Sequence, residues 1–414
     1  MPKLLQINST CNVGSTGKIA EGIGRLAIEA GWDSIIAYGR SYSPSKSQII
    51  KIGSSISVYN HILVSRIFDK HGLGSIGATE RFIKLIDTKL KPDIIHLHNI
   101  HGYYLNYSIL FQYLRSRNIP IVWTMHDCWP FTGHCAYFDR VSCCKWEIMC
   151  ENCPQLLAYP RSWGRDNSKY NFLSKKSSFL LHDRMFVVPV SYWLDSLLKK
   201  SFLKNIPRRV IHNGIDIKLF SPNSDLSFIE KYNLQGKNII LGVASPWSER
   251  KGLGDFFKLR ELLPVHQYAI VLVGLSPSQI RDLPQGIVGI QRTSSIKELA
   301  NIYSSASVFV NTTYEENYPT VNLEAISCGT PVITYNTGGS PESVTSHTGF
   351  VIKQGDIKAL VNAIKYISQK GKLFYSLKCR SYAEANFDQS KCFEQYIDLY
   401  NELLIIQKKY TLRV

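Results

Sequence analysis

Short blocks of aliphatic and β-branched residues alternate along the chain with stretches in which apolar residues recur at helical spacing. The blocks predict buried β-strands at residues 4–7, 34–38, 93–98, 121–125, 186–190, 209–212, 238–243, 268–274, 287–290, 307–311 and 332–335. Helical spacing is clearest at residues 19–27, 81–90, 320–328 and 391–408. Such alternation is typical of parallel, doubly wound α/β sheets, which bind ligands at the carboxyl ends of their strands.

The length of the chain favours two domains. It has 414 residues, of which 44% are hydrophobic, whereas single hydrophobic cores stop growing well below this size. The segment 205–207, Asn-Ile-Pro, has the composition of a hinge. We therefore expect a first domain at 1–205 and a second at 206–385, each with a Rossmann-like sheet.

The charge balance favours an anionic partner. Lys and Arg number 48 against 32 Asp and Glu, a formal net charge of +16, which suits a nucleotide, a nucleic acid or an acidic membrane surface. Residues 169–204 interleave basic pairs such as Lys175-Lys176 with aromatic and aliphatic residues. This stretch fits an anionic lipid surface or an ordinary solvated helix.

The N-terminal residues lack the basic region, long apolar core and small-residue cleavage site of a signal peptide. No apolar run approaches the roughly 18 residues that a membrane-spanning helix needs. We expect a cytoplasmic protein that is at most peripheral on the inner face of the cell membrane.

Two acids in the stretch 315–342 form an E-x7-E pair. Glu316 lies in the loop before a predicted helix that Thr320 would cap, and Glu324 lies about one turn inside that helix. A helix N-terminus suits a diphosphate, and an acid slightly deeper can accept hydrogen bonds from vicinal hydroxyl groups. A nucleotide sugar offers both groups. The alternative is that both acids are solvated surface charges.

The same stretch carries a resemblance to a known family. From Glu315 it reads ExxYPxxxxEAxxxGxPVxxxxxGGxPE, which is similar to the signature of the retaining nucleotide-sugar glycosyltransferases of family 4. Pro319 stands where that family usually has Gly. The resemblance implies the GT-B architecture, two Rossmann-like domains that face each other across a cleft. It also implies that residues 386–414 form a terminal helix returning to the first domain.

The resemblance implies roles for residues of the second domain. Glu316 would orient the donor sugar and favour positive charge at its anomeric carbon, and Glu324 would hold the ribose hydroxyls. Lys251 matches the family's diphosphate-binding Lys, but Ser245 replaces the usual Arg, so Arg250 is the candidate substitute. The remaining donor-binding candidates follow from the same motifs: Asn317, Tyr318, Thr320, Val321 and Arg292.

The first domain contributes further candidates. Gly14 and Gly17 lie in a turn between a strand and a helix, where the backbone can approach a phosphate or sugar closely, although a plain tight turn is the alternative. The segment 124–133 resembles the family's H-D-x-W loop, which makes His126 the candidate beside the donor sugar. His98 is an acceptor-side candidate.

Six of the ten cysteines lie in an insertion at about 128–153. Cys135, Cys143 or Cys144, Cys150 and Cys153 could supply four thiolates to a structural zinc, with Cys150-x2-Cys153 as one knuckle. Disulfides are disfavoured in the cytoplasm. The alternative is a set of loop and buried thiols without metal.

The resemblance implies transfer of a glycosyl group from a nucleotide diphosphate sugar to an acceptor hydroxyl. The acceptor would be a glycan or lipid-linked intermediate of capsule, exopolysaccharide or O-antigen synthesis. The sequence has no D-x-D motif, so we expect catalysis without a metal cofactor. The rivals are a GT-B epimerase or phosphorylase and a basic nucleic-acid-binding protein, for which the chain has no recognised motif.

Overall fold

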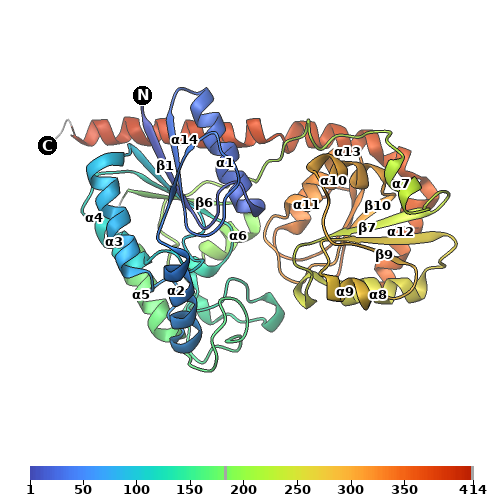
Figure 1. The fold of residues 1–414 in the computed structure, drawn as a ribbon, viewed down its shortest axis with the longest axis horizontal. Coiled ribbons are helices and arrows are strands. Elements are labelled where there is room, and N and C mark those ends of the chain that lie inside the picture. The colour runs from blue at the N-terminus through green and yellow to red at the C-terminus, as the bar shows by residue number, and fades with distance from the viewer. Residues whose placement is uncertain (181–183, 412–414) are drawn as a thin grey trace. The chain divides into compact units, whose positions relative to one another are not determined.

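The computed structural model describes residues 1–180 and 184–411 (Figure 1). The chain forms two compact units, one of Met1–His212 with Phe393–Val414 and one of Asn213–Cys392. The sequence placed the boundary after residue 205. The last helix belongs to both units, because it begins before the second one ends.

The first unit is built on a six-stranded parallel sheet. Its strands are β1 (Lys3–Asn8), β2 (Asp33–Tyr38), β3 (Gln48–Lys51), β4 (Ile94–Leu97), β5 (Ile121–Met125) and β6 (Met185–Pro189). Their order, β3-β2-β1-β4-β5-β6, is that of a doubly wound sheet, in which the chain changes direction between β1 and β4. The carboxyl ends of β1 and β4 therefore form a natural binding edge.

Helices connect these strands. They are α1 (Gly14–Glu29), α2 (Ser55–Phe68), α3 (Ile76–Leu85) with a π-helical continuation (Ile86–Leu90), α4 (Tyr107–Arg115), α5 (Ser168–Phe179) and α6 (Tyr192–Leu198). The Cys-rich segment between β5 and α5 has no strand, and its regular elements are the short 3-10 turns η2 (Trp129–Phe131), η3 (Asp139–Val141) and η4 (Lys145–Glu147). Side-chain contacts must therefore hold this long segment in place.

The second unit repeats the same strand order, β12-β11-β10-β7-β8-β9, again with every strand parallel. Its strands are β7 (Asn238–Val243), β8 (Tyr268–Val273), β9 (Ile287–Ile290), β10 (Val308–Asn311), β11 (Val332–Tyr335) and β12 (Gly349–Ile352). Its helices are α7 (Ser227–Lys231), α8 (Leu253–Leu262), α9 (Pro277–Arg281), α10 (Ile296–Ser305), α11 (Thr320–Ser327), α12 (Ile357–Lys370) and α13 (Lys372–Asn386), followed by α14 (Gln389–Thr411). Here the direction changes between β7 and β10.

The hydrophobic blocks predicted the interior strands closely, and the α/β doubly wound class is confirmed. The strand expected at 209–212 is wrong. Residues 209–212 form neither a strand nor a bridge; the isolated bridges flank the segment, at Arg208 with Val187 and at Ile215 with Asp388. The segment runs beside the edge strand β6, where the backbone N–H groups of Arg209 and Ile211 donate to the carbonyl oxygens of Val187 and Pro189, but these bonds do not form a continuous ladder.

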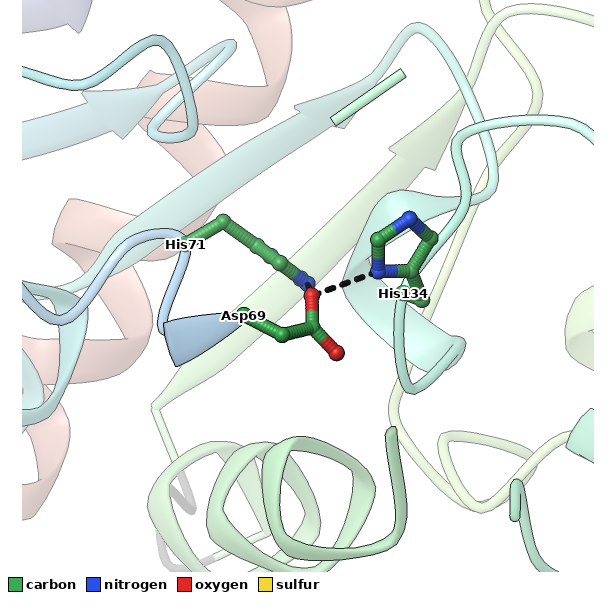
Figure 2. Close-up of side chains that lie close together, drawn as sticks. All are labelled: Asp69, His71 and His134. Atoms are coloured by element: carbon green, nitrogen blue, oxygen red, sulfur yellow. Dashed lines mark hydrogen bonds and ion pairs between the residues drawn. The ribbon is translucent and has the colours of Figure 1, made fainter. Parts of the chain in front are cut away.

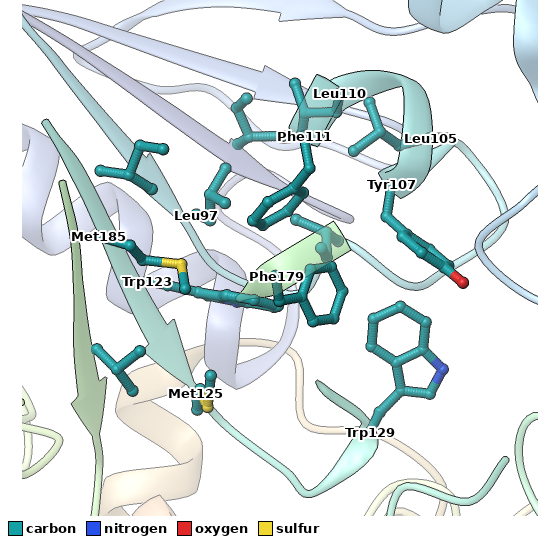
Figure 3. Close-up of a cluster of buried hydrophobic side chains, with 14 of the residues drawn as sticks. Leu97, Leu105, Tyr107, Leu110, Phe111, Trp123, Met125, Trp129, Phe179 and Met185 are labelled. Carbon is teal, nitrogen blue, oxygen red and sulfur yellow. The ribbon is translucent and has the colours of Figure 1, made fainter. Parts of the chain in front are cut away.

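Aromatic rings fill the core of the first unit between β5 and the helices that cover it (Figure 3). Phe179, at the end of α5, lies with its ring centroid 4.6 Å from Phe111 and 4.8 Å from Trp123. The pair with Trp123 is T-shaped, an arrangement that aromatic rings favour. These contacts fix α4 and α5 against the sheet.

Lys175 of α5 is wholly buried, which corrects the expectation of a basic, solvated or lipid-facing stretch at this point. Its ammonium group donates to the carbonyl oxygens of Trp129 at 2.7 Å and Thr132 at 3.0 Å, and lies 3.6 Å from the Trp129 ring centroid. Burial lowers the pKa of Lys175 to about 7. Lys175 thus ties α5 to the loop that follows β5.

Replacing Lys175 with Met should destabilise the protein by about 1–3 kcal/mol, because two buried carbonyl groups lose their donor. The neighbouring Lys176 is exposed, so Lys176→Met is the matched control and should change stability by less than about 0.5 kcal/mol. Urea unfolding of both variants measures the difference. Equal stabilities would show that Lys175 does not hold the loop.

Candidate active site

A partly buried ion pair lies where the second sheet changes direction. Lys251, in the loop after β7, donates to Glu316, in the loop after β10, with Nζ and Oε2 2.5 Å apart. Because β7 and β10 are neighbours and parallel, both loops leave the same edge of the sheet. The side chains are 21% and 16% exposed. This is the edge at which doubly wound sheets bind ligands.

Two glycines allow the loops to approach this closely. Gly252 has a φ of +72°, and a Cβ there would lie 2.2 Å from the carbonyl oxygen of Thr312. Gly338, after β11, has a φ of +54°, and its Cβ would lie 1.7 Å from the carbonyl oxygen of Glu316. Both positions therefore require glycine. Close backbone contact at Gly252 and Gly338 holds the loops that carry Lys251 and Glu316 in place.

Electrostatics keep Glu316 ionised. Burial alone raises the pKa of its carboxyl group, but the charges of Lys251 and Arg250 outweigh this effect and the pKa lies below its usual value. The Arg250 guanidinium itself donates to the carbonyl oxygen of Glu315 at 2.7 Å. Both basic residues expected to meet the diphosphate therefore lie beside the predicted catalytic acid.

The helix α11 starts next to Glu316. Its first residue is Thr320 and its N-cap is Pro319, with no side-chain cap, so the predicted capping by Thr320 is wrong. The proline has no hydroxyl group with which to cap the first-turn N–H groups, and Thr320 and Val321, at the start of the helix, are partly exposed. This helix terminus can accept an anion.

The residues between Glu316 and α11 are held from several sides. Tyr318 is buried, and its carbonyl oxygen accepts from the side chain of Asn213 at 3.2 Å. The backbone N–H of Asn317 donates to Glu316 Oε1 at 3.1 Å, and the Asn317 side chain is also buried. The loop is thus rigidly placed.

Glu324 has a definite partner. The hydroxyl of Tyr303, on α10, donates to Glu324 Oε2 at 2.9 Å. Burial and the nearby Glu324 carboxylate raise the pKa of Tyr303 well above its usual value, so the hydroxyl stays protonated. The motif around Glu324 could not predict Tyr303 as a partner, because Tyr303 lies on another helix. This bond orients the Glu324 carboxylate.

Arg292 lies just after β9, at the edge of the sheet, and its side chain is exposed. The described contacts do not join it to Lys251 or Glu316, so the expectation that Arg292 contacts the nucleotide base stays a prediction.

The first unit has its own polar edge at β1, β4 and β5. His98, just after β4, shares a hydrogen bond with Gln6 of β1 at 3.0 Å and another with His126, just after β5, at 3.2 Å. Burial lowers the pKa of His126 to about 4, so its ring is neutral near pH 7. The structure therefore brings the two predicted histidines together.

The predicted glycines open α1 at the same edge. Gly14 is its first residue, is exposed and has a φ of +67°. Gly17 is buried in the first turn, where a Cβ would lie 2.7 Å from the hydroxyl oxygen of Thr10. The strand, turn and helix arrangement is as expected, and donor contact by these glycines stays a prediction.

Asp127, next to His126, is also fixed. Its Oδ2 atom lies 2.9 Å from Nε2 of His101, and its Oδ1 accepts from the backbone N–H of Trp129 at 3.0 Å. Burial raises the pKa of Asp127, but His101 and the hydrogen bonds bring it below its usual value. Both carboxylate oxygens of Asp127 are therefore engaged, and this fixes the loop that carries His126.

The four cysteines predicted to bind zinc line one small cavity: Cys135, Cys143, Cys150 and Cys153. Cys144, the alternative to Cys143, is exposed. In the described part of the chain, the three metal-ligand atoms that meet within 4.8 Å belong instead to Asp69, His71 and His134 (Figure 2). Sequence analysis missed these three because the acid lies far from His134 along the chain.

Comparison with known proteins identifies the family of this chain. Residues 21–219 match the Glycosyltransferase Family 4 model and residues 226–385 match the model of glycosyl transferases group 1. The chain belongs to the glycosyltransferases. An Escherichia coli K12 relative, WcaC, whose name assigns it to colanic acid biosynthesis, is 24% identical over 97% of this chain and 100% of its own length.

The fold of this glycosyltransferase is GT-B, as the sequence predicted. Sucrose-phosphate synthase from Thermosynechococcus elongatus superposes with a TM-score of 0.73 at 20% identity, covering 98% of this chain and 100% of its own. HepE from Anabaena, solved with UDP-glucose, gives 0.67 at 14% identity, covering 97% and 99%. The family models and the glycosyltransferase relatives, not the fold alone, support an enzyme of the hexosyltransferase type. In its described residues, no helix is both long and apolar enough to cross a membrane.

Lys251→Ala should weaken the binding of a nucleoside diphosphate by about 1.5–3 kcal/mol, because a charge-assisted contact is lost. Lys297, exposed on α10, supplies the control Lys297→Ala with the same change of net charge. Calorimetric titration with a panel of nucleoside diphosphates measures both. Equal affinities for the two variants would remove Lys251 from the site.

The ion pair should also make stability depend on pH. Because the folded-state pKa of Glu316 is lowered, its contribution is complete above the usual value near 4.5 and is lost as the pH falls through the folded pKa. Glu316→Gln should therefore cost about 1.5–3 kcal/mol at pH 7, and the cost should shrink as the pH is lowered below about 4.5. Glu261→Gln, at an exposed position of α8, is the control. A cost independent of pH would contradict this account.

Proposed function

We propose that this glycosyltransferase moves a sugar from a nucleoside diphosphate sugar to an acceptor hydroxyl with retention of the anomeric configuration. The observation that carries the proposal is the Lys251–Glu316 pair beside the N-terminus of α11, which has no side-chain cap. This arrangement places two cations and a helix terminus next to one ionised acid. A diphosphate joined to a sugar has the complementary charges.

In the proposed reaction the bond between the anomeric carbon and the diphosphate oxygen breaks, and a bond to the acceptor oxygen forms on the same face. The electron pair of the broken bond goes to the diphosphate, which also takes the acceptor's proton. Lys251 and Arg250 stabilise the charge that develops on the leaving group. Glu316 faces the sugar, and its carboxylate favours the positive charge at the anomeric carbon.

Binding the donor would change the partner of Lys251. The ammonium group is held by Glu316 before binding, and a diphosphate with two negative charges competes for the same proton donors. Glu316 would then be released toward the sugar hydroxyls. The pair therefore keeps two partly buried charges compensated until the substrate supplies its own charge.

Glu324 and His126 take different tasks in this proposal. Glu324, oriented by Tyr303, would accept hydrogen bonds from the ribose hydroxyls in both the ground state and the transition state. The neutral ring of His126, held by His98, would hydrogen-bond the donor sugar without adding a positive charge beside the anomeric carbon.

The proposed acceptor is a lipid-linked or polysaccharide intermediate of cell-surface glycan synthesis. Two relatives support such a product by name, WcaC for colanic acid biosynthesis and CapM of Staphylococcus aureus for capsular polysaccharide biosynthesis. The UDP-glucose in the HepE structure supports a nucleotide sugar donor. The net charge of +16 favours a peripheral position on an anionic membrane surface. Lys251 and Arg250 supply the charge on the diphosphate side, so we propose no catalytic metal.

Substitution of the two acids tests the proposal. Glu316→Gln should mainly lower kcat, by about 100-fold or more, because its charge acts on the transition state. Glu324→Gln should mainly raise KM for the donor, because it binds ground and transition states alike. Transfer from a panel of nucleotide sugars to a lipid extract provides the assay.

The exposed Glu261→Gln serves as the control and should keep normal kinetics. Near-normal kinetics in both Glu316→Gln and Glu324→Gln would contradict the assignment. Turnover of the donor without any acceptor would favour an epimerase or a phosphorylase instead.

A further inference from the structure

The Cys-rich segment encloses a small cavity that the proposed function does not use. Its volume is about 20 Å³, which is the space of one water molecule or ion. Four thiols line it, from Cys135, Cys143, Cys150 and Cys153, and so does His134. Each of the four is a free thiol. A cavity of this size, surrounded by soft ligands, has the composition of a zinc site.

His134 presents an unsatisfied atom there. Its side chain is buried, its Nδ1 lies 2.6 Å from Asp69 Oδ1, and its Nε2 is buried without a hydrogen-bond partner. Figure 2 shows Nδ1 facing Asp69 and the second ring nitrogen pointing away from it. Since Nδ1–H donates to the carboxylate, Nε2 carries the lone pair. A buried acceptor without a donor is costly unless something binds it.

The Asp69 carboxylate is itself occupied, which argues against a metal within the cluster of Figure 2. Its Oδ2 accepts from the backbone N–H of Asn167 at 2.9 Å, while Oδ1 faces His134. His71 is engaged at Nδ1, which accepts from the indole N–H of Trp129 at 2.7 Å. The acid thus orients His134 instead of offering a ligand atom. A carboxylate behind a histidine is the usual second layer of a zinc site.

Basic side chains lie near the thiols. Burial raises the pKa of the Cys150 and Cys153 thiols, so thiolates there need positive charge nearby. Lys145 lines the cavity, and Lys175 lies close enough to act on the Cys150 thiol. Three thiolates and one histidine around Zn²⁺ carry one net negative charge, which these ammonium groups can balance.

We propose that this cavity is a structural zinc site in which Nε2 of His134 is one of four ligands and cysteine thiolates supply the other three. Asp69 is the positioning residue that fixes the tautomer and orientation of His134. No three cysteine sulfurs of the described residues meet within 4.8 Å. Zinc–sulfur bonds of about 2.3 Å would therefore require the thiol side chains to rotate toward the ion.

This site would anchor the loop that carries His126. Thr132 lines the cavity, and its carbonyl oxygen accepts a hydrogen bond from Lys175, which also donates to the carbonyl oxygen of Trp129. Zinc bound at His134 would therefore stabilise the segment that runs from the end of β5 to α5. The inference is independent of the proposed transfer reaction, because it concerns metal binding alone.

Metal analysis of full-length protein purified without chelator is the direct test, with about one zinc per chain expected. Competition with a chromogenic chelator should show a 10–100-fold loss of affinity for Asp69→Asn, as for other second-layer residues, and a larger loss for His134→Ala. Cys144→Ser is the matched control, because Cys144 is exposed and does not line the cavity. It should bind zinc normally.

His134→Cys supplies a replacement ligand and should retain stoichiometric zinc, which guards against a variant that merely fails to fold. Cobalt in place of zinc should give the visible spectrum of a three-thiolate, one-nitrogen site in the wild type and of a four-thiolate site in His134→Cys. Wild-type protein that takes up no zinc would overturn the proposal. So would His134→Ala that binds zinc as tightly as the wild type.

Discussion

The ion pair between Lys251 and Glu316 is the interaction on which the second unit's site depends. It exists because two adjacent parallel strands, β7 and β10, release their loops at one edge of the sheet. Gly252 and Gly338 then let the loop backbones approach to a distance that any side chain would prevent. The partner charges are thereby held together, ready for a substrate that carries charges of its own.

Much of this arrangement could be predicted from the sequence. The interior strands are continuous apolar blocks, so their number and order of appearance were clear, and the spacing of Glu316 and Glu324 indicated an acid on each side of a helix start. The strand predicted at 209–212 is absent because this apolar segment runs beside β6 with only scattered backbone hydrogen bonds and no continuous ladder. The prediction that Thr320 caps α11 is wrong because Thr320 is the first helical residue and Pro319 is the N-cap.

Contacts between distant segments could not be predicted in this way. Tyr303 orients Glu324 from another helix, and Asp69 reaches His134 from the end of α2. Lys175 belongs to a stretch that looks like a charged surface, yet it is buried under Trp129. In each case the partner is chosen by tertiary packing, which periodicity along one segment does not encode.

The two units serve the enzyme in different ways. The first holds its histidines in a buried chain from Gln6 through His98 to His126, and it keeps them neutral. The second concentrates positive charge around one ionised acid. The positive charge of the second unit suits the anionic diphosphate of the proposed donor.

A crystal structure of the enzyme with an intact nucleoside diphosphate sugar would test the central claim most directly. The quantity to measure is the distance between Lys251 Nζ and Glu316 Oε2, which is 2.5 Å here. The account predicts that Nζ leaves Glu316 for a diphosphate oxygen while Glu316 contacts the sugar. A diphosphate bound elsewhere, with the ion pair unchanged, would contradict it.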